Sequence, residues 1–248
     1  MNLGLSGRTA IVCGASSGLG LASAEAMAED GANVVVFARR GDLLAEHAAR
    51  IGAVAVDGDV READALQTLV TTAAERFGGV DIVVWNSGGP PPGRASDLTP
   101  ETVQSAVDLL LLPALRLIGI ARPHLERSPA GRIILITSVA VIEPTDHLAL
   151  SNIVRAAVTG WAKTLAREVG PNGITVNCVA PGRIATARLD ELYPGGPSAG
   201  DLEEIPLGRW GEPREFGDVV AFLASGRASY VTGTIVTVDG GLTRGLLT

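Results

Sequence analysis

Two serines and an arginine stand at spacings that could support chemistry on a carbonyl or alcohol oxygen. Ser138 follows an apolar, β-branched run over Ile133–Thr137, where a buried strand would end. Ser151 and Arg155 lie four residues apart in a stretch with helical periodicity, so we expect them to share one helix face. A hydroxyl can donate a hydrogen bond to a developing alkoxide, and a guanidinium stabilises negative charge without releasing its proton. By residue type, these three side chains could act on such an oxygen.

Three other residues on the same side of the chain could supply a proton. His147 lies four residues before Ser151, but a solvent-facing histidine at the start of a helix is the favoured interpretation. Glu143 and Tyr193 are more distant alternatives.

A glycine-rich loop follows the first predicted strand and opens the first predicted helix. Glycines let a backbone turn sharply and approach a pyrophosphate, while a helix N-terminus offers amide donors and a favourable dipole. In this strand–turn–helix context the loop predicts a dinucleotide site; a plain tight turn is the alternative. The candidate ligands are Gly14, Ser16, Ser17, Gly18, Leu19 and Gly20.

The end of the second predicted strand indicates which dinucleotide is bound. Arg39 and Arg40 stand where a carboxylate would bond the ribose hydroxyls of NAD. Arginine pairs with phosphate, and Ser16 could add a hydroxyl donor to a 2′-phosphate. We therefore expect NADP(H) to be preferred over NAD(H). The alternative is that the two arginines only solvate the start of a helix.

Short β-branched runs alternate with longer helical patterns from end to end. This alternation predicts one α/β domain over residues 1–248, with a doubly wound, seven-stranded parallel sheet in the order 3-2-1-4-5-6-7. The predicted strands are Thr9–Cys13, Val34–Phe37, Val54–Val56, Ile82–Trp85, Ile133–Thr137, Thr175–Val179 and Ile235–Val238. The predicted helices are Leu19–Asp30, Leu43–Ile51, Glu62–Phe77, Glu101–Leu125, Leu148–Val169 and Pro213–Ala224.

Two irregular segments should border a ligand. The stretch from Pro181 to Pro213 holds five prolines and six glycines, and its place after a late strand predicts a substrate lid over about 183–212. The loop Gly88–Gly93 follows the fourth strand, at the edge of the sheet where such folds bind ligands, and we expect it to shape the substrate pocket.

Composition excludes several classes of function. A net charge of −7 disfavours a nucleic-acid surface, and 46% hydrophobic residues can fill a large core. Cys13 and Cys178 lie in apolar runs without a second Cys or His at metal spacing, so we expect buried thiols and no metal site. The apolar run Val107–Ala121 is interrupted by charges and a proline. We expect a cytoplasmic protein with no membrane span.

Further motifs follow in order along the whole chain: Cys13-Gly14, Asp59-Val60, Trp85-Asn86-Ser87-Gly88, Pro181-Gly182, Pro206-Leu207-Gly208-Arg209, Val231-Thr232-Gly233 and Asp239-Gly240-Gly241. In them the chain resembles the short-chain dehydrogenase/reductase family, in particular its 3-oxoacyl-acyl-carrier-protein reductases. The resemblance implies a Rossmann fold and an NAD(P)(H)-dependent oxidoreductase acting on a small carbonyl or alcohol substrate. It also implies adenine contacts from Asp59 and Val60, nicotinamide contacts from Ile184 and Thr186, and further cofactor contacts from Asn86, Ser87, Gly88, Pro181 and Gly182.

The catalytic set of that family is Asn, Ser, Tyr and Lys, and here only the serine is kept, as Ser138. Ser151 replaces the tyrosine and Arg155 the lysine, while the asparagine position aligns best with Leu110, with Asp108 a weaker candidate. Arg155 can still bind the nicotinamide ribose. The leading interpretation is an oxidoreductase with an altered site. The alternatives are a cofactor-binding protein with little catalysis, acting as a sensor or partner subunit, and a lyase or isomerase.

Two predicted helices indicate self-association. Glu101–Leu125 and Leu148–Val169 are apolar over more of their circumference than a one-sided surface helix needs. In the resembling family these helices pair across a two-fold axis, which implies a homo-oligomer, a tetramer or a dimer.

Overall fold

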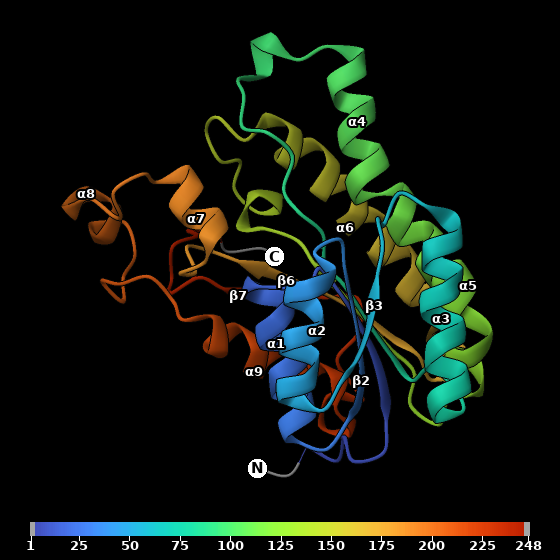
Figure 1. Ribbon diagram of the computed structural model, residues 1–248. Helices are drawn as coiled ribbons and strands as arrows, with labels where there is room; N and C mark the ends of the chain where they lie inside the picture. The colour runs from blue at the N-terminus through green and yellow to red at the C-terminus, as the bar shows by residue number, and fades with distance from the viewer. Residues whose placement is uncertain (1–2, 246–248) are drawn as a thin grey trace.

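The computed structural model describes residues 3–245, which form one parallel sheet between two layers of helices (Figure 1). The strand order is β3-β2-β1-β4-β5-β6-β7, which confirms the predicted doubly wound topology. The strands are β1 (Thr9–Cys13), β2 (Asn33–Ala38), β3 (Val54–Asp57), β4 (Ile82–Trp85), β5 (Arg132–Ile136), β6 (Thr175–Pro181) and β7 (Ile235–Val238).

Each face of the sheet is covered by a different set of helices. One layer holds α3 (Ala63–Phe77), α5 (Leu112–Arg127) and α6 (Ala149–Val169), and the other holds α1 (Gly18–Glu29), α2 (Gly41–Ile51) and α9 (Pro213–Ala224). Within β1, Ile11 and Cys13 pack into the first layer, whereas Ala10 and Val12 pack into the second. Because both faces are buried, the strands are apolar at nearly every position.

The predicted helix Glu101–Leu125 is wrong as a single element. The chain forms α4 (Pro100–Leu110) and α5, and the backbone changes direction at Leu111, whose φ is −101° and ψ −57°. Pro113 has no N–H to donate to the preceding turn, so the α-helical ladder cannot run through unbroken. As a result α4 projects at the top of Figure 1 and packs on α6 through Ala106 and Leu150.

The segment Pro100–Arg127 is long and apolar enough to cross a membrane by length and composition alone. One third of its most apolar stretch is buried inside the fold. Ala114, Leu117, Ile118, Ala121 and Leu125 of α5 belong to the core beneath the sheet, which explains much of this apolar character.

The predicted lid contains two short helices, α7 (Ala187–Leu192) and α8 (Ala199–Glu203), at the left of Figure 1. Its two ends meet where the N–H of Ala185 donates to the Gly211 carbonyl at 2.8 Å and the N–H of Gly211 donates to the Arg183 carbonyl at 2.9 Å. Arg183 holds the segment from inside, since its guanidinium donates to the Asp201 carbonyl and to Glu204. The predicted lid is therefore a folded segment whose two ends are hydrogen-bonded to each other.

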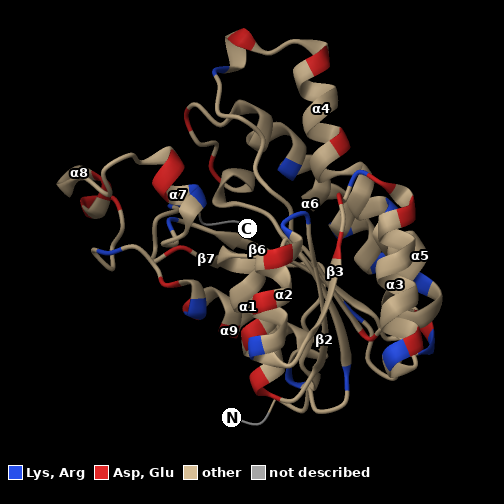
Figure 2. Ribbon diagram, viewed as in Figure 1, with Lys and Arg blue, Asp and Glu red and all other residues tan. Residues whose placement is uncertain are grey.

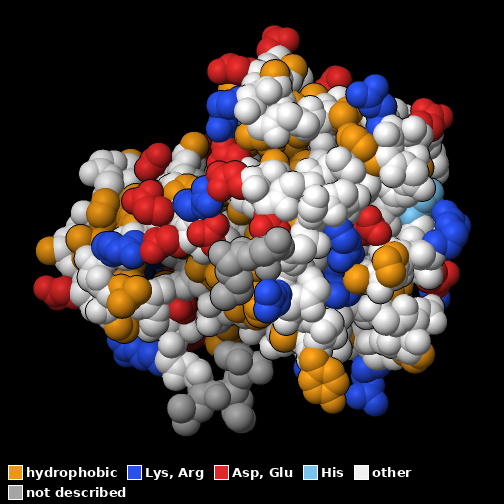
Figure 3. All heavy atoms as spheres, turned by 90° about the horizontal axis from the view of Figure 1, so that it is seen from below, with side chains coloured by type: hydrophobic (Ala, Val, Ile, Leu, Met, Phe, Trp, Pro, Cys, Tyr) orange, Lys and Arg blue, Asp and Glu red, His pale blue; other side chains and the backbone are white. Residues whose placement is uncertain are grey.

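Polar groups elsewhere are distributed as in a solvated globular domain. Figure 2 shows acidic and basic residues interspersed on the outer helices, and the face drawn in Figure 3 also mixes both signs.

Cys13 and Cys178 are buried free thiols, as predicted, and burial raises the pKa of both.

The contact between α1 and α9 depends on a glycine. A methyl group at Gly217 would lie 2.4 Å from the Ala22 carbonyl oxygen, so the two helices could not keep their separation. We expect Gly217→Ala to lower the free energy of unfolding by about 1–3 kcal/mol. In Gly226→Ala, the matched control, no described atom lies within 4 Å of the added methyl group, and stability should change little. Urea unfolding of both variants measures this; equal stabilities would contradict the packing argument.

Candidate active site

A cavity of about 1240 Å³ opens at the carboxyl edge of the sheet. The strand order reverses between β1 and β4, and ligands of doubly wound folds bind at such a reversal. The predicted site residues that border the cavity are Gly14, Ser16, Ser17, Gly18, Leu19, Arg39, Arg40, Asp59, Val60, Asn86, Ser87, Gly88, Ser138, Ser151, Arg155, Pro181, Gly182, Ile184 and Thr186. The cavity thus brings together residues that lie more than a hundred positions apart in the sequence.

Gly20 is the one predicted ligand missing from the described lining of the cavity, and it has a different role. A methyl group there would lie 2.3 Å from the Gly14 carbonyl oxygen. The same oxygen accepts a hydrogen bond from Asn86 Nδ2 at 3.3 Å. Gly14 itself has φ +62°, in the left-handed region that favours glycine. The glycines therefore let the loop after β1 lie directly against α1 and the end of β4.

The N-terminus of α1 is suited to an anion. Ser17 is the N-cap, yet its side chain makes no capping hydrogen bond to the described helix, and the first turn contains no acidic residue. The first amide groups of α1 keep their donors for a ligand. This arrangement fits the pyrophosphate of a dinucleotide, which Gly18 and Leu19 would approach through the backbone.

A second cationic position lies beside that loop. The Arg40 guanidinium donates to Ser16 Oγ at 3.0 Å and to Ser17 Oγ at 2.6 Å, which fixes it at the cavity wall. Arg39 borders the same cavity. The Asp59 carboxylate is held by Arg61, whose hydrogen bonds lower the pKa of Asp59 to about 2. The positive charge of Arg39 also lowers this pKa, so Asp59 lies within electrostatic reach of Arg39.

Ser138, Ser151 and Arg155 border the same cavity. Ser138 caps a short 3-10 turn and accepts a hydrogen bond from the Ala140 N–H at 3.2 Å, so its hydroxyl proton is not used in the cap. Ser151 is 8% exposed, on the first turn of α6. Arg155 lies one turn further and donates from Nη1 to the Ile136 carbonyl at 3.0 Å. The end of β5 thereby fixes both Ser138 and Arg155.

The guanidinium of Arg155 carries its charge across the neutral pH range. Burial, and secondly the positive charge of Arg188, lowers the pKa of Arg155 to about 10. A group with that pKa remains protonated at pH 7, so Arg155 can stabilise an anion but does not take part in proton relay.

Leu110, which aligns best with the family's asparagine, is not part of the described cavity lining. Leu110 is 1% exposed in a cluster with Leu150 and Val154, whereas Leu109 is the residue of this turn that borders the cavity. Asp108 accepts a hydrogen bond from Gln104 at 2.8 Å and is not part of the described lining. No polar side chain from this end of α4 reaches the site among residues 3–245.

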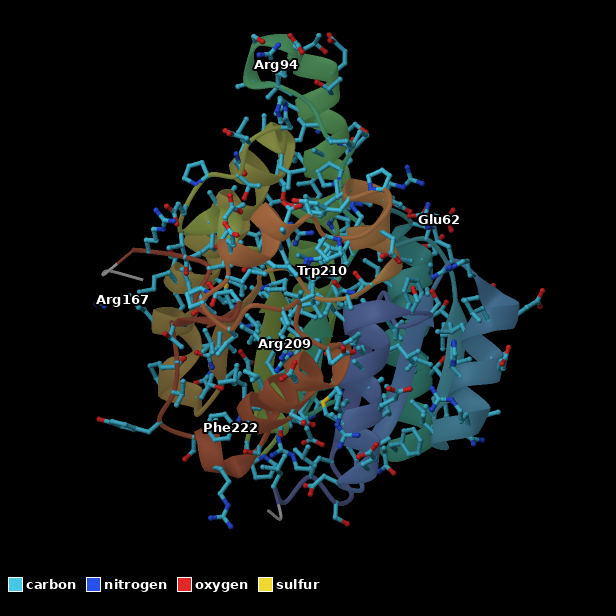
Figure 4. The ribbon with its side chains drawn as sticks, turned by 90° about the vertical axis from the view of Figure 1, so that its left-hand side faces the viewer. Glu62, Arg94, Arg167, Arg209, Trp210 and Phe222 are labelled. Carbon is cyan, nitrogen blue, oxygen red and sulfur yellow. The ribbon has the colours of Figure 1, made fainter. Side chains whose placement is uncertain are left out.

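The three alternative proton donors also border the cavity. His147 is exposed, as favoured from the sequence, and has φ +58°; its carbonyl accepts from the Gly93 N–H at 2.7 Å. Glu143 accepts from the Arg244 N–H at 3.2 Å. Tyr193 accepts from Arg183 Nε at 3.1 Å and packs edge-on against Trp210, labelled near the centre of Figure 4. Each is held by the chain around it.

Sequence reasoning did not identify two arginines of the lid that border the cavity, Arg183 and Arg188. Arg188 donates from Nη2 to the Pro90 carbonyl at 2.9 Å, so α7 contacts the loop Gly88–Gly93 across the cavity. Gly88, Gly89 and Pro90 of this loop also border the cavity, and the expectation that the loop shapes a substrate pocket stays a prediction. The available signal was position, because both arginines follow Pro181-Gly182 on the segment that carries Thr186.

Comparison with known proteins agrees with this geometry. A family model described as enoyl-(acyl carrier protein) reductase matches residues 14–243. Cyclohexanol dehydrogenase of a Rhodococcus species is 35% identical, over 98% of this chain and 98% of that protein. A 3-oxoacyl-[acyl-carrier-protein] reductase of Synechocystis is 36% identical, over 96% and 98%. The chain therefore belongs to the short-chain dehydrogenase/reductase family.

Solved structures of the same fold include enzymes bound to NADPH. L-sorbose reductase from Gluconobacter frateurii, complexed with NADPH and L-sorbose, superposes with a TM-score of 0.91 at 33% identity, covering 99% of this chain and 100% of that one. YwfH, an NADPH-dependent reductase involved in bacilysin biosynthesis, has a TM-score of 0.91 at 26% identity, over 96% and 99%. These neighbours support an oxidoreductase with a nicotinamide dinucleotide.

The glycine contact gives a direct test of the dinucleotide site. Gly20→Ala would push its methyl group against the Gly14 carbonyl and displace the loop, so the dissociation constant for NADPH should rise at least about tenfold, or 1.4 kcal/mol. Gly170→Ala, in open space at the other end of α6, should bind as the wild type does. Fluorescence titration measures both; unchanged binding in Gly20→Ala would show that the loop is not a phosphate site.

Proposed function

We propose that the protein is an NADP(H)-dependent oxidoreductase that transfers hydride to or from a small carbonyl or alcohol substrate at an altered Ser/Arg site. One observation carries the proposal. Ser138, Ser151 and Arg155 border the same cavity as the glycine loop. Arg40, which is hydrogen-bonded to Ser16 and Ser17, borders it too. The candidate catalytic side chains and the residues expected to bind the cofactor therefore border one cavity.

Each residue has a distinct role in this proposal. The bound nicotinamide supplies or accepts the hydride. Ser138 donates a hydrogen bond to the substrate oxygen, and Arg155 binds the nicotinamide ribose and offsets the charge that develops on that oxygen. Ser151 is a second, weaker hydroxyl donor. The proton itself comes from solvent, because neither serine nor arginine releases one at neutral pH.

The absent phenol favours a second candidate, a cofactor-binding protein with little catalysis. Loss of a general acid costs about 10²–10⁴-fold in rate, whereas positioning of the reactants can be retained without it. Ser138 favours the enzyme, because a protein that only binds the dinucleotide needs no hydroxyl there. Turnover of NADPH with a panel of ketones and aldehydes separates the two candidates.

The two arginines after β2, Arg39 and Arg40, predict cofactor selectivity. We expect NADPH to bind at least about tenfold more tightly than NADH, or 1.4 kcal/mol, because Arg39 and Arg40 can pair with the 2′-phosphate. Arg39→Ala and Arg40→Ala divide the effect between the two arginines, and the double variant should lose the preference. NADH affinity is the internal control. Equal wild-type affinities for the two cofactors would exclude this role.

The altered site predicts an unusual order of mutational effects. Ser138→Ala should reduce turnover more than Ser151→Ala, because Ser138 keeps its place at the end of β5 whereas Ser151 lacks the reach and acidity of a phenol. Arg155→Ala should also weaken NADPH binding. Steady-state kinetics and cofactor titration measure these effects. Loss of turnover in Ser151→Ala with activity retained in Ser138→Ala would reverse the assignment.

Restoring the family pair tests the same roles in the opposite direction. Ser151→Tyr combined with Arg155→Lys should raise activity if the pocket accepts a family substrate, because a phenol and a lysine supply the missing proton transfer. The single variants serve as controls, since neither completes the pair.

We also propose a homotetramer. Leu115 of α5 is 37% exposed and Ile153 of α6 is 48% exposed, so both helices keep apolar surface outside the protomer. Pairing about a two-fold axis would bury it. Light scattering should give about four times the protomer mass of 25.4 kDa, and a particle of one protomer mass at micromolar concentration would contradict the proposal.

A further inference from the structure

An aromatic side chain of the predicted lid is fixed at the cavity by two neighbours. Tyr193 follows the last turn of α7 and borders the cavity. Its hydroxyl accepts a hydrogen bond from Arg183 Nε at 3.1 Å, and the guanidinium carbon of Arg183 lies 5.3 Å from the centre of the Tyr193 ring. The Trp210 ring packs edge-on against the same ring, with 5.9 Å between the centroids. These contacts restrain both the hydroxyl and the plane of the Tyr193 ring.

Arg183 is itself fixed by the two short helices of the predicted lid. Its side chain is only 14% exposed. Each nitrogen of its guanidinium has a partner in this segment: Nε donates to Tyr193, Nη1 to the Asp201 carbonyl and Nη2 to Glu204. Arg183 therefore joins the end of α7 to α8, and it keeps the ring that it contacts in one place.

Trp210 supports the Tyr193 ring from outside the cavity. Tyr193 belongs to the described cavity lining and Trp210 does not, so the phenol ring lies on the cavity side of the pair. The indole Nε1 of Trp210 is buried and has no hydrogen-bond partner among residues 3–245. A buried N–H group without a partner is unfavourable, so packing against Tyr193 accounts better for the position of the indole than hydrogen bonding does.

The Tyr193 ring lies beyond the positions expected for the cofactor phosphates. The side chain of Thr186 lies 3.4 Å from where a β-carbon of Gly18 would stand, so Thr186 is the residue of the predicted lid beside the glycine loop. Helix α7 separates Thr186 from Tyr193, and its rise places their backbones about 10 Å apart along the helix axis. The printed side-chain partners of Tyr193, Arg183 and Trp210, both belong to the predicted lid.

We propose that Tyr193 determines substrate specificity: its fixed ring limits the size of the ketone or secondary alcohol that the cavity accepts, and Arg183 is a positioning residue that acts through this ring. The inference rests on the proposed oxidoreductase function and names the residue that selects the substrate by size. A close-packed ring yields to a bulkier ligand only by giving up the contacts that hold it. Small differences in the volume of such a wall change selectivity strongly.

The test compares a compact ketone, cyclopentanone, with a bulky one, 4-tert-butylcyclohexanone, and uses NADPH as reductant. In Tyr193→Ala the ratio of kcat/KM for the bulky over the compact ketone should rise at least about tenfold, because the space of the ring is opened. In Tyr193→Trp, which enlarges the ring, the ratio should fall at least about threefold. Tyr193→Phe keeps the ring against Trp210, so its ratio should stay within about twofold of the wild type.

The positioning role of Arg183 is tested with the same two ketones. Arg183→Gln should raise the ratio at least about threefold, because the ring is released although it is still present. A purely structural role would lower kcat/KM for both ketones equally and leave their ratio unchanged. Arg183→Lys should return the ratio towards the wild type. The matched control is Arg209→Gln: Arg209 precedes Trp210 in the chain and is labelled in Figure 4, pairs with Glu215 and is not part of the described lining, so the ratio should not change.

Binding measurements separate failure of this inference from failure of the proposed function. A wild type that reduces neither these ketones nor the panel of ketones and aldehydes would refute the proposed function. Calorimetric titration of both ketones into NADP⁺-loaded wild type, Tyr193→Ala and Tyr193→Trp would still decide the inference. The same shifts in the ratio of the two dissociation constants support it, and an unchanged ratio or no ketone binding at all refutes it.

Two further results guard against a misfolded or misassigned variant. If Tyr193→Ala does not fold, Tyr193→Leu and Tyr193→Trp decide, since both keep an apolar side chain against Trp210. The dissociation constant for NADPH should change less than about twofold in every Tyr193 variant. A larger loss of NADPH affinity in folded protein would assign Tyr193 to the cofactor site and overturn the proposal.

Discussion

The close approach of Gly14, Gly20 and Asn86 fixes the geometry on which the site depends. At this point the end of β1, the first turn of α1 and the end of β4 meet, and the Asn86 side chain fills the space that the two glycines leave, with Nδ2 donating to the Gly14 carbonyl at 3.3 Å. The sheet reverses its strand order between the same two strands. A cavity can open there because no crossover helix covers the gap. The free amide groups of α1 then face that cavity, which the other candidate binding residues also border.

Electrostatics within the cavity follow from where the acidic residues are used. Asp59 forms an ion pair with Arg61, Glu204 with Arg183 and Glu191 with Arg188. Arg39, Arg40 and Arg155 border the cavity without an ion-pair partner among residues 3–245. Glu143 and Asp146 border the same cavity, so side chains of both signs line it. An anionic group of a ligand would bind where Arg39, Arg40 and Arg155 lie.

Local rules were enough to predict the sheet and the glycine loop from sequence. Each strand is a short apolar run and each helix a longer periodic one, so the alternation determines the topology once right-handed crossovers are assumed. The break at Leu111 was missed because the apolar pattern continues through it, although Pro113 could have indicated a change of direction. At the end of α4, Leu109 borders the cavity whereas Leu110 is buried in the core, because neighbouring residues of a helix point in different directions. Arg188 could not be predicted, because its contact with Pro90 joins positions 98 residues apart across a lid of irregular structure.

In the site that we propose, Arg155 takes the place of the family's lysine and Ser151 that of its tyrosine, and the chemistry changes accordingly. A tyrosine–lysine pair works because the lysine charge makes the phenol a better acid and its amine can pass on a proton. Arginine retains the charge without the transferable proton, so a phenol beside it would lose its relay. With serine at position 151, the relay is absent from both members. The hydrogen bond from Arg155 to the Ile136 carbonyl anchors the cation at the end of β5, next to Ser138. Under this proposal, a fixed charge and a hydroxyl donor stabilise the substrate oxygen in place of a mobile proton.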